Sequence, residues 1–307
     1  MRDQQTSRFS IEPILDSIVH NQHKPKPAQV LYHYTDWVAA KGIITHQHIW
    51  ETAHDCVNDD HELQAAHEVI LDEAHKLLMK SRGTAYRALY HFIQAYERLK
   101  ISNMKTIYMA CFSIARDDLY QWKHYAADGR GLCLGIRVLD EQAPISSIMG
   151  SALLKIDYFQ PSWEKHIRTA FSKICSQLSR TNCTSANIEE GMAAFYRIAA
   201  FTAISAKKPK WAPEREFRHV TIIRDGVDFT PKTRIRDGKE IRYLDEVTLR
   251  EHRQLLAFAE IIIGPNQDST TARNELAEIL KAAGYTPNMM EYPAITVSEL
   301  SAWQSKA

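Results

Sequence analysis

Residues 30–35 read Val-Leu-Tyr-His-Tyr-Thr, and the predicted fold begins at this stretch. Its β-branched and aromatic side chains are typical of a β-strand. Asp36 follows directly and is placed to cap a short helix over residues 38–43. Residues 1–29 end in alternating lysines and prolines, which cannot continue a helix, so they are predicted to form an extended lead-in.

The polar residues of this strand fall on one side. Because side chains alternate along a strand, His33 and Thr35 share one face, and Tyr32 and Tyr34 share the other. Two interpretations follow. The face with His33 can line a cleft, where the imidazole donates to a ribose or phosphate and a tyrosine stacks on a flat ring. Alternatively, His33 is a buried, hydrogen-bonded histidine at a sheet edge.

Outward from this strand, the apolar pattern predicts two helical insertions and several further strands. Apolar residues recur at helical spacing over about 62–100 and 160–206. Further strands are predicted at 106–113, 132–136, 153–159, 216–223, 241–244 and 259–263. Helices and strands do not alternate strictly, and no linker divides the chain. We therefore predict one α+β domain over residues 30–307, rather than a doubly wound parallel sheet.

The charge balance excludes a whole-protein electrostatic field. The 307 residues carry 38 lysines and arginines against 37 acidic residues. A nucleic acid or an anionic membrane would therefore have to be held by a local patch. No run approaches the roughly 18 apolar residues of a membrane span, and residues 1–5 lack an apolar segment. These features predict a cytoplasmic protein without membrane association.

The five cysteines indicate neither a disulfide framework nor a zinc ribbon. They are odd in number and widely separated, and no two form a Cys-x-x-Cys pair. Cys111 and Cys133 lie in apolar runs and are predicted to be small core residues.

The acidic segment around Asn58, Asp59 and Glu62 is a candidate polar site. His61 and His67 are six residues apart, whereas two imidazoles on one helical face need a separation of four. The spacing argues against a transition-metal site, and no metal is expected. A hard-cation site on the carboxylates remains an alternative, beside the simpler interpretation of a polar loop that caps a helix.

The densest charged stretch leads into a predicted strand. Period-2 geometry places Glu214, Glu216 and Arg218 on one side of it. This group is either a solvated, salt-bridged strand face or a site in which a carboxylate stabilises a cation and Arg218 holds an anion. The preceding lysines and an aromatic residue are expected to form a basic rim: Lys207, Lys208, Lys210 and Trp211.

Several motifs in a fixed order resemble a known family. They run from about Val30 to Pro265: Leu31-Tyr32-His33-Tyr34-Thr35, Asn58-Asp59-x-x-Glu62, Cys111-Phe112-Ser113, Leu119-x-x-Trp122-x-x-Tyr125-Ala126, Gly131-Leu132-Cys133-Leu134-Gly135, Glu214-x-Glu216-Phe217-Arg218 and Ile262-Ile263-Gly264-Pro265. Together they resemble the bacterial domain-of-unknown-function family 2971.

That family is similar, more distantly, to ADP-ribosyltransferase-like proteins, and the resemblance implies a split, mostly antiparallel central sheet. In such proteins an early strand carries His or Arg, a middle strand Ser or Tyr, and a late strand Glu. Carried over, His33 binds the nicotinamide ribose, Ser113 lies in the middle strand, and Glu216 is the catalytic carboxylate, with Glu214 beside it. Tyr34 or Trp122 would stack on the nicotinamide. The large helical insertions and the roles of Asn58, Asp59 and Arg218 have no counterpart in that scheme.

Three functional hypotheses follow. The first is an NAD-dependent ADP-ribosyltransferase-like enzyme, a bacterial toxin or defence effector that modifies protein or nucleic acid, with NAD as its substrate. The second is a non-catalytic module that binds a nucleotide or nucleic acid through Trp122, Tyr125, Arg218 and the lysines at 207–210. The third is a metal-dependent nuclease around Asp59 and Glu62. The sequence does not indicate an oligomeric state.

Overall fold

The computed structural model describes residues 29–57, 63–98, 106–137, 151–223, 230–236, 238–245, 258–289 and 292–303. Most of the predicted lead-in lies outside these ranges, as do Asn58, Asp59 and Glu62. In the described part of the chain, no helix is both long and apolar enough to cross a bilayer.

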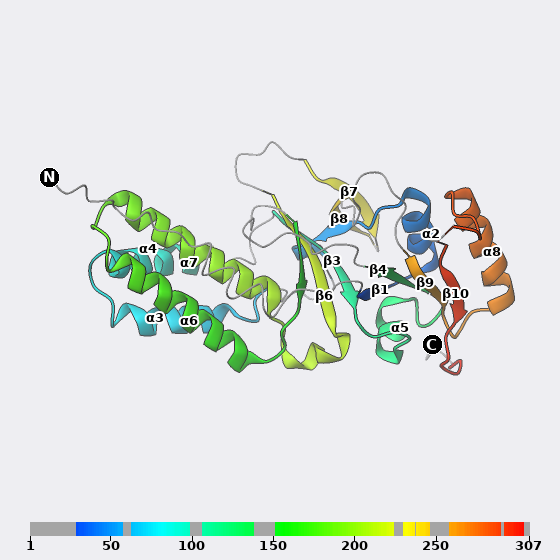
Figure 1. Cartoon of the computed structure of the whole chain (residues 1–307), viewed down its shortest axis with the longest axis horizontal. Helices are drawn as coiled ribbons and strands as arrows, with labels where there is room; N and C mark the ends of the chain where they lie inside the picture. The colour runs from blue at the N-terminus through cyan, green and yellow to red at the C-terminus, as the bar shows by residue number, and fades with distance from the viewer. Residues whose placement is uncertain are drawn as a thin grey trace.

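Four helices form an arm that extends from one side of the sheet (Figure 1). They are α3 (His67–Leu78), α4 (Gly83–Arg98), α6 (Gln160–Leu178) and α7 (Ser185–Ser205). They lie in the two segments where helical spacing predicted them. Their apolar stripes meet in one core that includes the edge-to-face and tilted rings of Phe92, Phe171 and Phe195. Helices of this length are stable mainly because such a stripe is buried.

The remaining helices lie against the sheet. They are α2 (Trp37–His46), α5 (Leu119–Tyr125) and α8 (Ser269–Ala282), with two 3₁₀ helices, η1 (His54–Cys56) and η4 (Pro209–Glu214). The predicted cap is present, since Asp36 accepts from the amide of Ala39, and Asp118 likewise accepts from the amides of Tyr120 and Gln121. Each cap satisfies helix N–H groups that have no partner inside the helix.

Ten strands of the described chain form one sheet. They are β1 (Val30–Thr35), β2 (Glu51–Ala53), β3 (Ile107–Ser113), β4 (Leu132–Arg137), β5 (Ser151–Lys155), β6 (Glu216–Ile222), β7 (Lys232–Arg236), β8 (Lys239–Leu244), β9 (Phe258–Ile263) and β10 (Ala294–Val297). One path runs β10-β9-β4-β1-β3-β2-β8-β7, and β6 and β5 continue from the other edge of β3. Only the β9–β10 pair is parallel. The predicted α+β class with a mostly antiparallel sheet is confirmed.

The two faces of the sheet are covered by different helices. On β3, Met109 lies in the core of the helical arm, whereas Phe112 lies in the core formed with α2 and α8. We call these sides the arm face and the α8 face. Alternation then places Cys111 and Ser113 on the arm face together with Met109.

The position of β1 explains how two sheet halves meet. Strand β1 pairs with β4 along six residues, whereas its pairing with β3 consists of Tyr32 opposite Ser113. On the same edge of β3, β2 pairs with Met109 and Tyr108. Strands β1 and β2 therefore pair with successive parts of the same edge of β3.

Candidate functional site

The charged stretch at the start of β6 folds into a compact cluster. Lys207 follows α7, Glu214 ends η4, and Glu216 and Arg218 begin β6. Arg215 has a φ of 46°, a left-handed turn that separates the two carboxylates by one tight bend. We refer to Lys207, Glu214, Glu216 and Arg218 as the Glu216 cluster.

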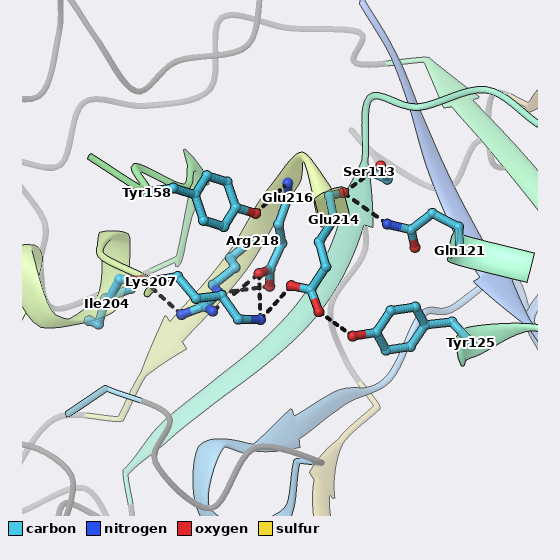
Figure 2. Close-up of polar contacts among 9 residues, drawn as sticks. All are labelled: Ser113, Gln121, Tyr125, Tyr158, Ile204, Lys207, Glu214, Glu216 and Arg218. Atoms are coloured by element: carbon cyan, nitrogen blue, oxygen red, sulfur yellow. Dashed lines mark hydrogen bonds and ion pairs between the residues drawn. The ribbon is translucent and has the colours of Figure 1, made fainter. Parts of the chain in front are cut away.

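Lys207 joins the two carboxylates. Its Nζ donates to Glu214 Oε2 at 2.6 Å and to Glu216 Oε2 at 3.0 Å, as Figure 2 shows. Arg218 holds the other side of Glu216, because its Nε donates to Oε1 at 2.8 Å and its Nη2 to Oε2 at 3.2 Å. Arg218 Nη1 is fixed in turn by the carbonyl of Ile204 at 3.0 Å. Two cations thus balance two anions.

All four side chains of the Glu216 cluster are buried. The alternative of a solvated strand face is therefore wrong. The predicted position of Lys207 on an outer rim is also wrong, since its ammonium group lies between the two carboxylates. Sequence spacing could not show this, because Lys207 is drawn inward by main-chain pairing of residues 206 and 207 with Asp157.

The two carboxylates differ in their acidity. Burial alone would raise the pKa of Glu216, but the charges of Arg218 and Lys207 outweigh it and hold that pKa well below its usual value. Burial raises the pKa of Glu214, and the attraction of Lys207 does not offset it. The cluster therefore pairs a strongly ionised carboxylate with one that retains a proton more readily.

Neighbouring elements fix the main chain of Glu214. Its carbonyl accepts from Ser113 Oγ at 2.7 Å and from Gln121 Nε2 at 2.9 Å, while Tyr125 donates its hydroxyl to Glu214 Oε1 (Figure 2). The backbone amide of Glu216 donates to Tyr158 Oη at 2.9 Å. Strand β3 and helix α5 thus position the two carboxylates. Gln121 and Tyr158 were not predicted, since each acts through a contact between distant segments.

Cys111 gives solvent access to this region. Its side chain is exposed, although every other residue of β3 is buried. The thiol lies close enough to the Glu216 carboxylate to interact with it electrostatically. The prediction of a core cysteine is confirmed for Cys133 and wrong for Cys111.

His33 does not share a face with Glu216. Tyr32, Ser113 and Glu216 pair in one row across β1, β3 and β6, so alternation turns His33 to the α8 face. Its ring lies 5.7 Å from that of Phe112, and its Nδ1 shares a hydrogen bond of 2.9 Å with the carbonyl of Cys111. His33 and Glu216 therefore contact the same residue, Cys111, from different sides.

Two of the aromatic residues expected to stack on a ligand are buried in the core. Trp122 is fully buried and donates to Asp117 Oδ1 at 2.7 Å. Tyr34 packs edge-to-face on Trp122 and donates to the carbonyl of Ala115 at 2.7 Å. Thr35 is also buried. In this conformation none of the three offers a surface to a ligand.

Trp211 is the partly exposed ring next to the cluster. Lys207 lies 5.4 Å and Lys210 lies 4.9 Å from its ring centroid. Its buried Nε1 has no hydrogen-bond partner. The preceding lysines and the tryptophan were predicted as a rim, and that position agrees with the structure for Lys208, Lys210 and Trp211.

In the described ranges, no three His, Cys, Asp or Glu side chains gather as metal ligands. The candidate cation site at Asn58, Asp59 and Glu62 lies outside those ranges and stays a prediction.

Comparison with known proteins supports part of the motif resemblance. Neither a curated protein nor a solved structure matches this chain. Residues 121–219, which carry Trp122, Tyr125 and the Glu216 cluster, match the model of a family described as a protein of unknown function (DUF2971).

Proposed function

We propose that this chain is an NAD-dependent ADP-ribosyltransferase-like enzyme with Glu216 as its catalytic carboxylate. The observation that carries the proposal is a Glu216 carboxylate that Arg218 and Lys207 hold in place beside the exposed side chain of Cys111. A negative charge held where positive charge develops lowers the barrier to forming a ribosyl cation. The strand order β1-β3-β6 supports it, because it brings the strands of His33, Ser113 and Glu216 together.

The proposed step breaks the bond between C1′ of the ribose and the nicotinamide nitrogen. The electron pair leaves with nicotinamide, and Glu216 stabilises the cation that remains. An oxygen or nitrogen of the acceptor then bonds to C1′ and releases its proton. Glu214 is suited to accept that proton, since burial raises its pKa above the usual value of a carboxyl group. Water can serve as the acceptor in the absence of another one.

The ligand is expected to enter at Cys111. The Cys111 side chain lies on the arm face beside Glu216, whereas His33 lies on the α8 face, so a ligand that enters at Cys111 reaches Glu216 and not His33. Trp211 offers the partly exposed ring that Trp122 and Tyr34 do not. Nicotinamide is a flat ring, and stacking on an indole suits it.

Release of nicotinamide from NAD tests this proposal. We expect purified wild-type protein to release it, and Cys111→Trp to raise KM because the larger ring fills the entrance. Cys183→Trp is the control, since Cys183 is an exposed cysteine at the end of the arm. Absence of both NAD binding and nicotinamide release in the wild type would overturn the proposal.

One observation favours the second hypothesis, a binding module without chemistry. Both oxygens of Glu216 are already occupied by Arg218 and Lys207. A catalytic carboxylate needs a free lone pair facing the ribose. Binding of NAD in calorimetry without any release of nicotinamide would select this alternative.

A further inference from the structure

The hairpin of β7 and β8 carries a basic and aromatic surface at the far edge of the sheet (Figure 1). Alternate residues of the paired strands β7 and β8 point to the same side of the sheet. Thr52 of β2 points to that side too, because it pairs with Tyr243. We call it the hairpin face: Trp50, Tyr243, Lys232, Arg234, Arg236 and Lys239.

The aromatic residues of the hairpin face are held in place by contacts with one another and with Arg234. Trp50 stacks on Tyr243 with ring centroids 4.4 Å apart and an angle of 25° between the rings. The guanidinium of Arg234 lies 5.0 Å from the Trp50 ring and 5.9 Å from the Tyr243 ring. Trp50 is nevertheless 39% exposed. A large exposed indole held in a fixed orientation is a ready stacking surface.

Cations outnumber anions on this face. Four of its six residues are basic, and Asp245 neutralises Lys232. Glu240 is the acidic residue within the two strands, and alternation puts it on the opposite side, across from Ile235. Among the described residues, the hairpin face therefore has more basic than acidic side chains.

Arg234 lies next to both aromatic rings of the hairpin face and close to the charge of Arg236. Burial and the nearby charge of Arg236 lower the pKa of Arg234, and the attraction of Asp36 is weaker than that repulsion. Its Nε is buried and has no hydrogen-bond partner. An anion placed between these two arginines would relieve their repulsion and supply an acceptor.

We propose that the hairpin face binds single-stranded nucleic acid, with a base stacked on Trp50 and phosphates held by Arg234, Arg236 and Lys239. Single strands combine exposed flat rings with closely spaced negative charges, which matches this combination of an indole and cations. An acidic peptide would use the charges but leave the exposed face of Trp50 without a stacking partner.

The hairpin face lies on the same side of the sheet as the Glu216 cluster. Thr52 pairs with Met109, and Met109 lies on the arm face with Cys111. A strand bound at Trp50 therefore lies on the side where NAD is proposed to bind. This makes nucleic acid the acceptor class under the proposed function, whereas binding to the hairpin face does not depend on that function.

Fluorescence anisotropy with a labelled 12-nucleotide single strand of mixed sequence, as DNA and as RNA, tests the proposal at 50 and 200 mM salt. We expect Trp50→Ala to weaken binding about tenfold or more, because stacking on one base is lost. Arg236→Gln should weaken binding and reduce the dependence of log K on log salt by about one unit.

Tyr86→Ala is the matched control, since Tyr86 is an exposed aromatic residue on the arm, and it should bind as the wild type does. Glu216→Gln should also retain binding, so a failure of the NAD hypothesis leaves this result intact. Lack of binding by the wild type would overturn the proposal. So would equal binding by Trp50→Ala, or equally tight binding of a labelled poly-glutamate peptide.

Discussion

Two buried carboxylates in this protein, Glu73 and Glu216, are each paired with one arginine and one lysine but lie in different surroundings. Glu73 in the helical arm is held by Arg168 at 2.9 and 3.0 Å and by Lys76 at 3.0 Å. Glu216 in the sheet is likewise held by an arginine and a lysine.

The difference lies in the exposure of the cations. Arg168 and Lys76 are 57% and 53% exposed, whereas Arg218 and Lys207 are 0% and 9% exposed. Burying both members of an ion pair costs solvation that their attraction does not always repay. The arm shows that this fold stabilises a buried carboxylate with solvated cations. The Glu216 cluster differs from this arrangement in that its cations are buried as well.

The largest expected effect concerns the arginines. Arg218→Met should lower the free energy of unfolding by about 3–5 kcal/mol, because it leaves Glu216 buried with one cation fewer. Arg168→Met should cost far less, since water replaces the exposed guanidinium. Urea unfolding followed by circular dichroism measures both. Equal losses of unfolding free energy in Arg218→Met and Arg168→Met would show that burial of the arginine does not distinguish the Glu216 pair from the Glu73 pair.

A smaller effect is expected in acid. The pKa of Glu216 is lowered in the folded protein, so its contribution to stability is present above its unfolded pKa, about 4.3, and is lost as the pH falls towards the folded value. The pKa of Glu214 is raised, so its contribution is largest at low pH and is lost as the pH rises.

Urea unfolding of Glu216→Gln and Glu214→Gln between about pH 3 and pH 7 tests these signs. The stability gap between wild type and Glu216→Gln should narrow as the pH falls. For Glu214→Gln, the stability of the variant relative to wild type should improve as the pH rises. The stability difference between wild type and variant should change with pH in opposite directions for Glu216→Gln and Glu214→Gln. A change in the same direction would contradict the lowered pKa of Glu216 or the raised pKa of Glu214.

The smallest effect is expected from salt. Sodium chloride at 0.5 M should narrow the stability gap between wild type and Glu73→Gln, because mobile ions screen its exposed partners. The gap for Glu216→Gln should stay nearly constant, since both of its cationic partners are buried and are screened much less. Thermal unfolding at low and high salt measures both gaps. A gap for Glu216→Gln that narrows as much as that for Glu73→Gln would mean that ions do reach the cluster.

The sequence predicted those features that depend on local spacing. Period 2 placed Glu214, Glu216 and Arg218 on one side of a strand, which holds for Glu216 and Arg218 but is wrong for Glu214, because Glu214 ends η4 before the strand begins. Period 2 also separated His33 from Tyr32, and this holds in the structure. The arm helices followed from their apolar stripes. The α+β class followed from the order of elements.

Features that depend on which distant segments meet could not be predicted. Pairing of β3 with both β1 and β6 decides that His33 and Glu216 face opposite sides. The exposure of Cys111 depends on contacts between segments far apart in the chain, so the apolar sequence around it was misleading. Trp122 has the composition of a stacking residue, but packing against β1 and a hydrogen bond to Asp117 bury it.

The most direct test of the central claim is the rate of nicotinamide release by Glu216→Gln and Glu73→Gln, measured side by side on folded protein. Each change removes one negative charge from a buried carboxylate held by an arginine and a lysine. We expect Glu216→Gln to lower kcat about 10²- to 10³-fold, as the loss of one group that stabilises transition-state charge does, and Glu73→Gln to leave kcat unchanged. Equal rates in the two variants would contradict a catalytic role for Glu216.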